Sequence, residues 1–200
     1  MTHDEIIQQL IWAGRVLVAE GQDDFTRGHI SFRLPDDPSR FFMKAHSLGL
    51  DEITPENVLT IDLDGKVVAG SARRHSEVYI HSEIFKVRPD VNCVIHTHPP
   101  YAVALSATGR PMRGYSQPSA LFYEALGVYT DTINLIRSTE MGAGVGAASR
   151  GAVEESRRRR GWREHRGDRR QCDHVGKCSN DTDGRRGDRH SGARIPARRH

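Results

Sequence analysis

Hydrophobic residues near the start of the chain recur at the spacing of a helix. Between residues 4 and 21, apolar or small residues stand at positions 6, 7, 10, 11, 14, 17 and 18, which is the 3.6-residue period of an amphipathic helix. Thr2 or Asp4 can cap the start of this helix, and Gly21 can end it. We therefore expect the domain to open with a helix.

Alternating apolar and polar residues then predict short strands. The segments GHISFRL (28–34) and FFMKAH (41–46) flank the turn sequence PDDPSR. The segment VLTIDLDGKVVAG (58–70) alternates on both sides of Asp64-Gly65, a dipeptide typical of a tight hairpin turn. Antiparallel strands are thus expected to follow the first helix.

A second helix and a buried strand come next. Segment 76–90 has apolar residues at 78, 80, 84 and 85, with Ser76 as a candidate N-cap. The segment VNCVIHTH (91–98) is typical of a buried strand that ends at Pro99-Pro100, and residues 101–109 indicate a further helix. This succession of helices and strands predicts an α/β domain.

A length of 200 residues fits one domain with a tail, and the charges divide the chain near residue 150. Residues 1–150 hold 14 Lys and Arg against 18 Asp and Glu, a net charge of −4, whereas residues 151–200 hold 15 against 8, a net charge of +7. The second segment has no Leu, Phe, Met or Tyr, so it cannot bury enough apolar surface to order itself. We therefore expect a domain over 1–149 and a disordered, Arg-rich tail over 150–200.

The chain shows no sign of secretion or of membrane insertion. No stretch resembles a secretory signal or approaches about 18 apolar residues, so we expect a cytoplasmic protein without a membrane span. Three cysteines, of which only Cys93 lies in the apolar part of the chain, do not make a disulfide framework.

Two histidines stand one residue apart at the end of the predicted buried strand. Side chains at i and i+2 of a strand share one face, so His96 and His98 are expected to bring two imidazoles to one point. Two neutral imidazoles together suit a divalent metal such as zinc. The ordinary alternative is that one ring faces solvent while the other is a hydrogen-bonded core group.

Glu77 and His81 lie one turn apart in the second predicted helix. That helix packs back on the sheet, so the Glu77 carboxylate can reach the end of the neighbouring strand as a fourth ligand or a general base. In the alternative interpretation, Glu77 only complements the helix dipole. His81 is expected to support the site from behind or to belong to the core.

Several of these motifs together resemble the family of class II aldolases and adducin head domains, which includes fuculose-phosphate aldolases. The segment HSEVYIHSEIFKVRPDVNCVIHTHPPYAVALSATG carries its S-E-x-x-x-H, R-P-D and H-x-H motifs, GHISFRL matches its N-terminal segment, and the resemblance spans about residues 4–149. It implies a three-layer α/β/α sandwich with a mixed central sheet, incomplete here in its C-terminal part. It also implies a homotetramer with active sites between subunits.

The resemblance further implies a lyase site. A divalent ion, Zn²⁺ or else Mn²⁺, Co²⁺ or Mg²⁺, would be bound by His96, His98 and a third, later histidine, with Glu77 as the catalytic acid/base. Such a site would cleave a C–C bond of a small hydroxy-carbonyl acid or sugar phosphate through a metal-stabilised enediolate, by retro-aldol cleavage or decarboxylation. Four residues fall where relatives hold the phosphate or carboxylate of the substrate: Gly28, His29, Ser31 and Ser47.

Two positions depart from the family's aldolases. His29 stands where those aldolases have asparagine, and the histidine version resembles members that act on non-phosphorylated acids, some of them decarboxylases. Gln117 stands where they carry a tyrosine proton donor, although Tyr115 is close. Aldol cleavage by the usual donor is therefore not expected.

The family's third histidine belongs to an Asn-His-Gly segment that the chain lacks after STEMGAGVGAA. Joining the last two bases of each codon to the first base of the next allows residues 150–177 to be translated as AVLLKNHGVVVAGVNIEETVVSATMLEN, which contains it. Trp162 followed by Arg163 must then give glycine, as the family requires. Our hypothesis is that the chain is frameshifted from about residue 150, which predicts weak metal binding, low stability and impaired activity, with an unpaired sheet edge.

Other functions remain open. The domain could be a non-catalytic interaction module like the adducin head domain. The basic tail could bind nucleic acid, with Trp162 stacking on bases, but eight acidic residues interrupt its positive charge and argue against this. Cys172, His174 and Cys178 match no strong zinc template and lack a fourth ligand.

Overall fold

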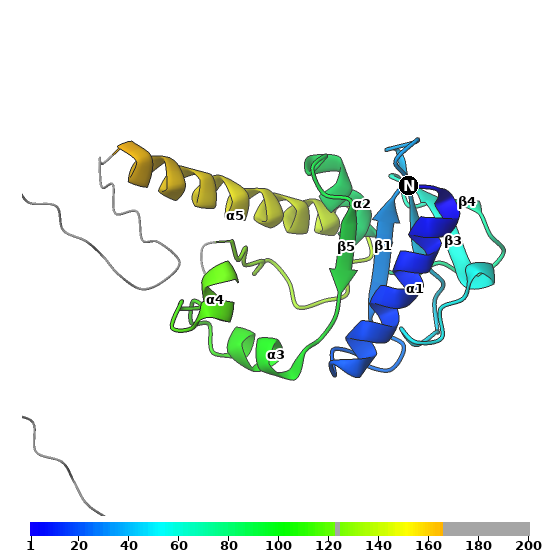
Figure 1. Ribbon diagram of the computed structural model, residues 1–200, viewed down its shortest axis with the longest axis horizontal. Coiled ribbons are helices and arrows are strands. Elements are labelled where there is room, and N and C mark those ends of the chain that lie inside the picture. Colours follow the sequence, from blue (N-terminus) through cyan, green and yellow to red (C-terminus); the bar gives the residue numbers. More distant parts are fainter. Residues whose placement is uncertain (123–124, 166–200) are drawn as a thin grey trace, which may run out of the picture. The chain divides into compact units, whose positions relative to one another are not determined.

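A five-stranded sheet forms the centre of the computed structural model, which describes residues 1–122 and 125–165 (Figure 1). The strand order is β4-β3-β2-β1-β5, and every neighbouring pair is antiparallel. The Asp64-Gly65 turn joins β3 to β4 as predicted. We expected a mixed sheet, but no two neighbouring strands within the described ranges are parallel. The strands are β1 His29–Arg33, β2 Arg40–Lys44, β3 Val58–Asp62, β4 Val67–Ala69 and β5 Cys93–His96.

Helix α1 (His3–Ala19) covers one face of the sheet (Figure 1). It begins as predicted, because Thr2 and Glu5 form a capping box in which each side chain bonds the other residue's backbone N–H. Its apolar stripe joins one of the two core clusters, which removes these side chains from water. That cluster is made of Ile6, Leu10, Ile11, Ile30, Leu34, Phe42, Leu50 and Ile53.

Helix α2 (Val78–Val87) covers the opposite face. The second core cluster lies under it and contains Phe41, Met43, Ala45, Leu59, Ile61, Val78, Phe85 and Val94. The prediction of an α/β/α sandwich is thus confirmed. The expected N-cap at Ser76 is wrong by one residue, because Glu77 occupies the cap position and makes no capping hydrogen bond with its side chain. That carboxylate is left available for another role.

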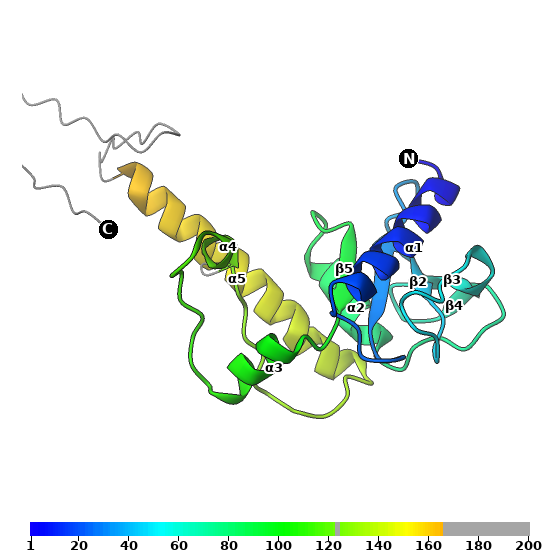
Figure 2. The same cartoon turned by 60° about the horizontal axis from the view of Figure 1, so that its bottom comes forward.

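The remaining helices follow β5. Helix α5 lies against α2 in both views, and its glycines make this approach possible (Figures 1 and 2). A Cβ on Gly142 would lie 2.6 Å from the carbonyl oxygen of Tyr79, and one on Gly146 would lie 3.0 Å from that of Glu83. These helices are α3 Pro100–Ala107, α4 Gln117–Phe122 and α5 Thr139–His165, and a 3₁₀ turn spans Pro55–Asn57.

Helix α5 does not end at residue 149, where the sequence analysis places a domain boundary. Residues 150–165 are helical, which differs from the expected disorder of that stretch. The rest of the tail, including the Cys172, His174 and Cys178 group, lies outside the described residues. The boundary itself stays a prediction.

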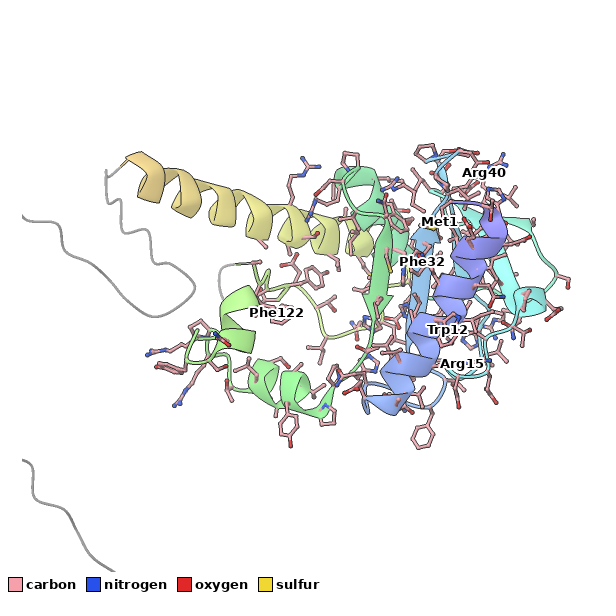
Figure 3. The ribbon with its side chains drawn as sticks, in the orientation of Figure 1. Met1, Trp12, Arg15, Phe32, Arg40 and Phe122 are labelled. Carbon is pink, nitrogen blue, oxygen red and sulfur yellow. The ribbon has the colours of Figure 1, made fainter. Side chains whose placement is uncertain are left out.

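Some large apolar side chains are exposed on the described surface. Trp12, on the outer side of α1, is 64% exposed, and Phe122, in α4, is 57% exposed (Figure 3). Ile95 in the outermost strand β5 is 46% exposed. No helix among the described residues is both long enough and apolar enough to cross a membrane.

Candidate metal centre

The register of strands β1 and β5 sets two histidines side by side. His29 and His96 are direct cross-strand partners, and their rings stack with centroids 4.5 Å apart and an interplanar angle of 16°. Alternation along β1 sends Ile30 into the α1 core, so His29 points to the α2 face. His96 shares that face with Val94, a member of the core under α2.

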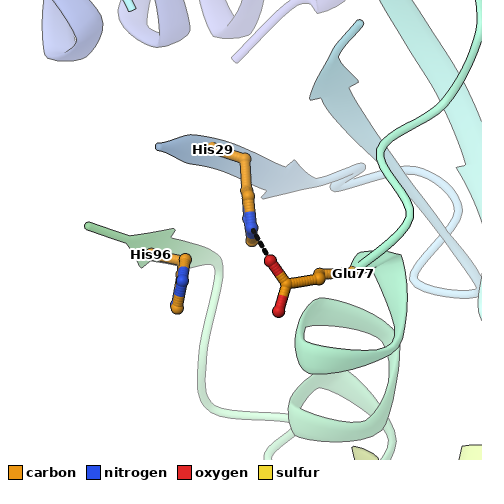
Figure 4. Close-up of side chains that lie close together, drawn as sticks. All are labelled: His29, Glu77 and His96. Carbon is orange, nitrogen blue, oxygen red and sulfur yellow. Dashed lines mark ion pairs between the residues drawn. The ribbon is translucent and has the colours of Figure 1, made fainter. Parts of the chain in front are cut away.

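The start of α2 adds a carboxylate to this pair. A Glu77 oxygen lies 3.8 Å from Nε2 of His29 (Figure 4), and the other oxygen accepts a 3.2 Å hydrogen bond from the backbone N–H of Ile136. Glu77 is 7% exposed. The donor atoms of His29, Glu77 and His96 all lie within 4.8 Å of one another.

His98 approaches the same site from beyond the end of β5. Its Nε2 lies 2.9 Å from Nε2 of His96, so the two imidazoles converge as predicted. Its Nδ1 lies 2.9 Å from a carboxylate oxygen of Asp24, and this hydrogen bond lowers the pKa of Asp24. Because the carboxylate accepts a hydrogen bond from the N–H at Nδ1 of His98, Nε2 of the neutral ring keeps its lone pair, which faces His96. Metal-binding histidines are commonly held in this way.

His29 is held from behind by a buried histidine. Nδ1 of His29 lies 2.5 Å from Nε2 of His81, whose Nδ1 lies 2.6 Å from the hydroxyl of Ser31. All three side chains are fully buried. Burial holds the pKa of both His29 and His81 well below its ordinary value, so both rings are neutral.

A further histidine, His75, closes one side of the cluster. Its ring centroid is 4.2 Å from that of His29, and burial lowers its pKa to about 4. Burial also lowers the pKa of His96, which the nearby carboxylate of Glu77 opposes. The buried rings of His29, His75 and His96 therefore favour the neutral form, which carries the lone pair that metal coordination needs.

The predicted anion-binding residues fall into two groups. Gly28 is buried, and a Cβ there would lie 3.0 Å from Leu50, whereas Ser47 is exposed on its loop at a positive φ of 64°. Ser31 faces His81 from inside the core. A substrate role for these residues stays a prediction.

The arrangement of His29, Glu77 and His96 fits a divalent ion. Nε2 of His29 is buried without a hydrogen-bond partner in the described part of the chain, although it points towards a carboxylate. Donors held about 2 Å from one ion stand roughly 3 to 4 Å apart, so small shifts would close these groups around a cation. Two imidazoles and a carboxylate are a ligand set typical of zinc and related transition metals.

The structure brings together three predicted site residues and adds others. Glu77 and His96 belong to one group of donors with His29, which was expected to hold substrate, and His98 reaches this group through its contact with His96. The contact of Asp24 with His98 was missed, because 74 residues separate them and no local pattern joins them. Tyr115, the nearest tyrosine to the expected donor position, is 83% exposed.

Comparison with known proteins identifies the family. The chain matches the Class II Aldolase and Adducin N-terminal domain over residues 8–161. Methylthioribulose-1-phosphate dehydratase of Pseudoalteromonas translucida is 32% identical over 119 residues, 58% of this chain and 55% of that protein. The 3,4-dihydroxyphthalate decarboxylase of Arthrobacter keyseri is 31% identical over 119 residues, 56% of this chain and 48% of that protein.

A solved structure supports the same assignment. The L-fuculose 1-phosphate aldolase from Glaciozyma antarctica PI12 aligns with a TM-score of 0.63 and 26% identity, over 72% of this chain and 56% of that chain. The protein described here belongs to the family of class II aldolase and adducin N-terminal domains. It spans about half the length of the curated relatives that it matches.

Proposed function

We propose that the chain is the metal-binding domain of a divalent-metal-dependent lyase. The observation that carries the proposal is the buried Nε2 of His29, which has no hydrogen-bond partner among the described residues and faces Glu77 beside His96. A buried polar atom without a partner is costly, and a cation at this point would satisfy it. Zinc suits these ligands best, with Mn²⁺, Co²⁺ or Mg²⁺ as the other candidates.

The substrate we propose is a small hydroxy-carbonyl acid or sugar phosphate. The relatives are named as a dehydratase, a decarboxylase and an aldolase. Retro-aldol cleavage of a hydroxy-carbonyl compound, or loss of CO₂ from one, can leave an enediolate that a cation stabilises. A bound divalent ion supplies Lewis-acid stabilisation of the negative charge that develops on the substrate oxygens. We propose C–C cleavage, by decarboxylation or retro-aldol reaction, as the chemistry of this domain.

Each residue has a distinct part in this proposal. His29 and His96 would supply imidazole nitrogens to the ion, and His98, 2.9 Å from His96, would supply another. Glu77 moves a proton to or from the substrate carbon, because one of its oxygens is anchored by the N–H of Ile136 while the other faces the site. Gly28 and Ser47 are proposed to hold the anionic group of the substrate.

We also propose that this chain is an impaired form of the domain. The strand that carries His96 is outermost in the described sheet, and Ile95 beside it is 46% exposed. The family's Asn-His-Gly strand, paired along this edge, would extend the sheet and add a fourth imidazole to the three of His29, His96 and His98. The intact domain is proposed to assemble as a homotetramer.

Metal content and lyase activity test the proposal on the full chain. We expect weak binding of up to about one zinc ion per chain at excess zinc, loss of that binding in His96→Ala, and low enediolate-type turnover that Glu77→Gln abolishes. His3→Ala is the matched control, because His3 is an exposed histidine paired with Asp36 on the surface. If neither this chain nor the chain with the restored reading frame takes up a divalent metal, the lyase is rejected and an interaction module like the adducin head domain is favoured.

A further inference from the structure

A chain of three buried side chains ends at the candidate metal centre. The hydroxyl of Ser31 lies 2.6 Å from Nδ1 of His81, and Nε2 of His81 lies 2.5 Å from Nδ1 of His29. Ser31, His81 and His29 have no exposed surface. This series of hydrogen-bonded side chains therefore does not reach water at Ser31 and cannot carry protons out of the site.

The two imidazoles of this chain must share one tautomer. Both rings are fully buried, and a charged imidazolium is costly in such a place, so each ring carries one N–H and one lone pair. A single proton fits between Nδ1 of His29 and Nε2 of His81. Either both rings are protonated on Nε2 or both are protonated on Nδ1.

Only one of these arrangements lets His29 bind a cation. With both rings protonated on Nε2, Ser31 donates to His81 and His29 presents an N–H to the site. With both protonated on Nδ1, His29 donates to His81, His81 donates to the Ser31 hydroxyl, and Nε2 of His29 offers its lone pair. A hydroxyl serves both arrangements because it can donate and accept.

We propose that Ser31 and His81 are positioning residues that fix the orientation and the tautomer of His29, so that its Nε2 can bind the divalent ion. The inference rests on the proposed metal-binding function and adds two residues that do not touch the ion. It also gives Ser31 a role different from holding substrate, since its hydroxyl faces His81. Groups that hold metal-binding histidines in this way typically change metal affinity by roughly 10–100-fold when they are removed.

Zinc affinity of single and double variants tests the proposal, measured on the full chain by competition with a chelator. Ser31→Ala leaves the N–H of His81 without an acceptor in the zinc-bound arrangement, so we expect binding roughly 10–100-fold weaker than wild type. His81→Phe removes the support and should weaken binding by a similar factor. The matched control is Ser82→Ala, because the Ser82 hydroxyl is also fully buried but has no hydrogen-bond partner among the described residues.

A conservative variant separates positioning from folding. In His81→Gln the amide oxygen can accept from Nδ1 of His29 without help from Ser31, so zinc affinity should stay within a few-fold of wild type. Adding Ser31→Ala to His81→Gln should then cost nothing more, although the same change weakens binding when His81 is present. Equal zinc affinities in Ser31→Ala and Ser82→Ala, or an unchanged affinity in His81→Phe, would overturn the inference.

Nitrogen-15 NMR of the histidine rings tests the chain without metal. In the zinc-free protein we expect His29 and His81 to be neutral and to share one tautomer. Zinc should place both ring protons on Nδ1. Opposite tautomers in the zinc-free protein contradict the inference, even if the wild-type chain binds no zinc. Matching tautomers in a protein that binds no zinc, with or without the restored reading frame, would support the hydrogen-bonded series Ser31–His81–His29 and reject the lyase proposal.

Discussion

His29 and His96 are direct partners across strands β1 and β5, and their rings stack with centroids 4.5 Å apart. Glu77 comes close to both rings from the start of helix α2. His96 is therefore shared by two sets of donors, one with His98 and one with His29 and Glu77. The candidate centre is wider than the H-x-H motif alone.

The first prediction concerns His29. We expect His29→Asn, which restores the residue typical of the family's aldolases, to weaken zinc binding by more than about tenfold, because it removes a buried imidazole from the ligand set. Chelator competition with the purified variant measures this affinity, and circular dichroism checks that the fold is kept. Unchanged zinc affinity would show that His29 is not a ligand and would return it to a substrate role.

The second prediction concerns Asp24. Asp24→Asn keeps the size of the side chain but removes the negative charge of the carboxylate that accepts a hydrogen bond from Nδ1 of His98. We expect zinc affinity to fall by roughly 10–100-fold while the fold is retained, since Asp24 lies in a loop at the surface of the site. Asp23→Asn is the control, because Asp23 is its exposed neighbour. If both variants bind zinc as the wild type does, His98 needs no carboxylate support.

The sequence predicted most of the elements but not all of the site. Periodicity located α1 and α2 because each buries one face, and the turn sequences PDDPSR and Asp64-Gly65 marked the ends of the four N-terminal strands. The i, i+2 spacing correctly placed His96 and His98 together. The pairing of β1 with β5 depends on tertiary register, which local patterns do not encode, so His29 was not recognised as a neighbour of His96. Helix α3 buries no side chain, so its length followed only from its bounding Pro and Gly residues.

The third prediction concerns the buried Lys44. Its amine donates to the carbonyls of Thr26 and Leu48, at 3.4 and 2.5 Å, and burial lowers its pKa to about 8 from 10.5. Between pH 8 and 10.5 the unfolded chain binds more protons at this group than the folded chain, so the free energy of unfolding should rise with pH. The expected contribution over this window is about 3 kcal/mol.

Urea denaturation of the metal-free protein at a series of pH values measures this effect. In Lys44→Met the free energy of unfolding should lack this part of its rise above pH 8, because methionine has no amine to deprotonate. Lys66→Met, at an exposed position before β4, should keep it. Identical pH dependences in wild type and Lys44→Met would contradict the assignment of a buried charged amine.

The fourth prediction concerns the sheet edge beside His96. Strand β5 is outermost in the described sheet, and Ile95 within it is 46% exposed, as expected for a domain that lacks a neighbouring strand. In the alternative translation of residues 150–177, an apolar segment, VVVAG, directly follows Asn-His-Gly. Such a strand could pair with the edge of β5 and bring a further imidazole to the centre, beside those of His29, His96 and His98.

Sequencing the coding DNA and restoring the frame test this prediction together. If the shifted frame encodes the segment AVLLKNHGVVVAGVNIEETVVSATMLEN, the protein that carries it should melt at a higher temperature and bind zinc at least about tenfold more tightly than the present chain. The gain should come from the new histidine, so replacing that residue with alanine should remove the gain in zinc affinity but keep most of the gain in stability, which comes from covering apolar side chains. A coding sequence whose shifted frame gives no apolar strand, or a restored protein with the same zinc affinity, would contradict the hypothesis, because the edge of β5 would then need another explanation.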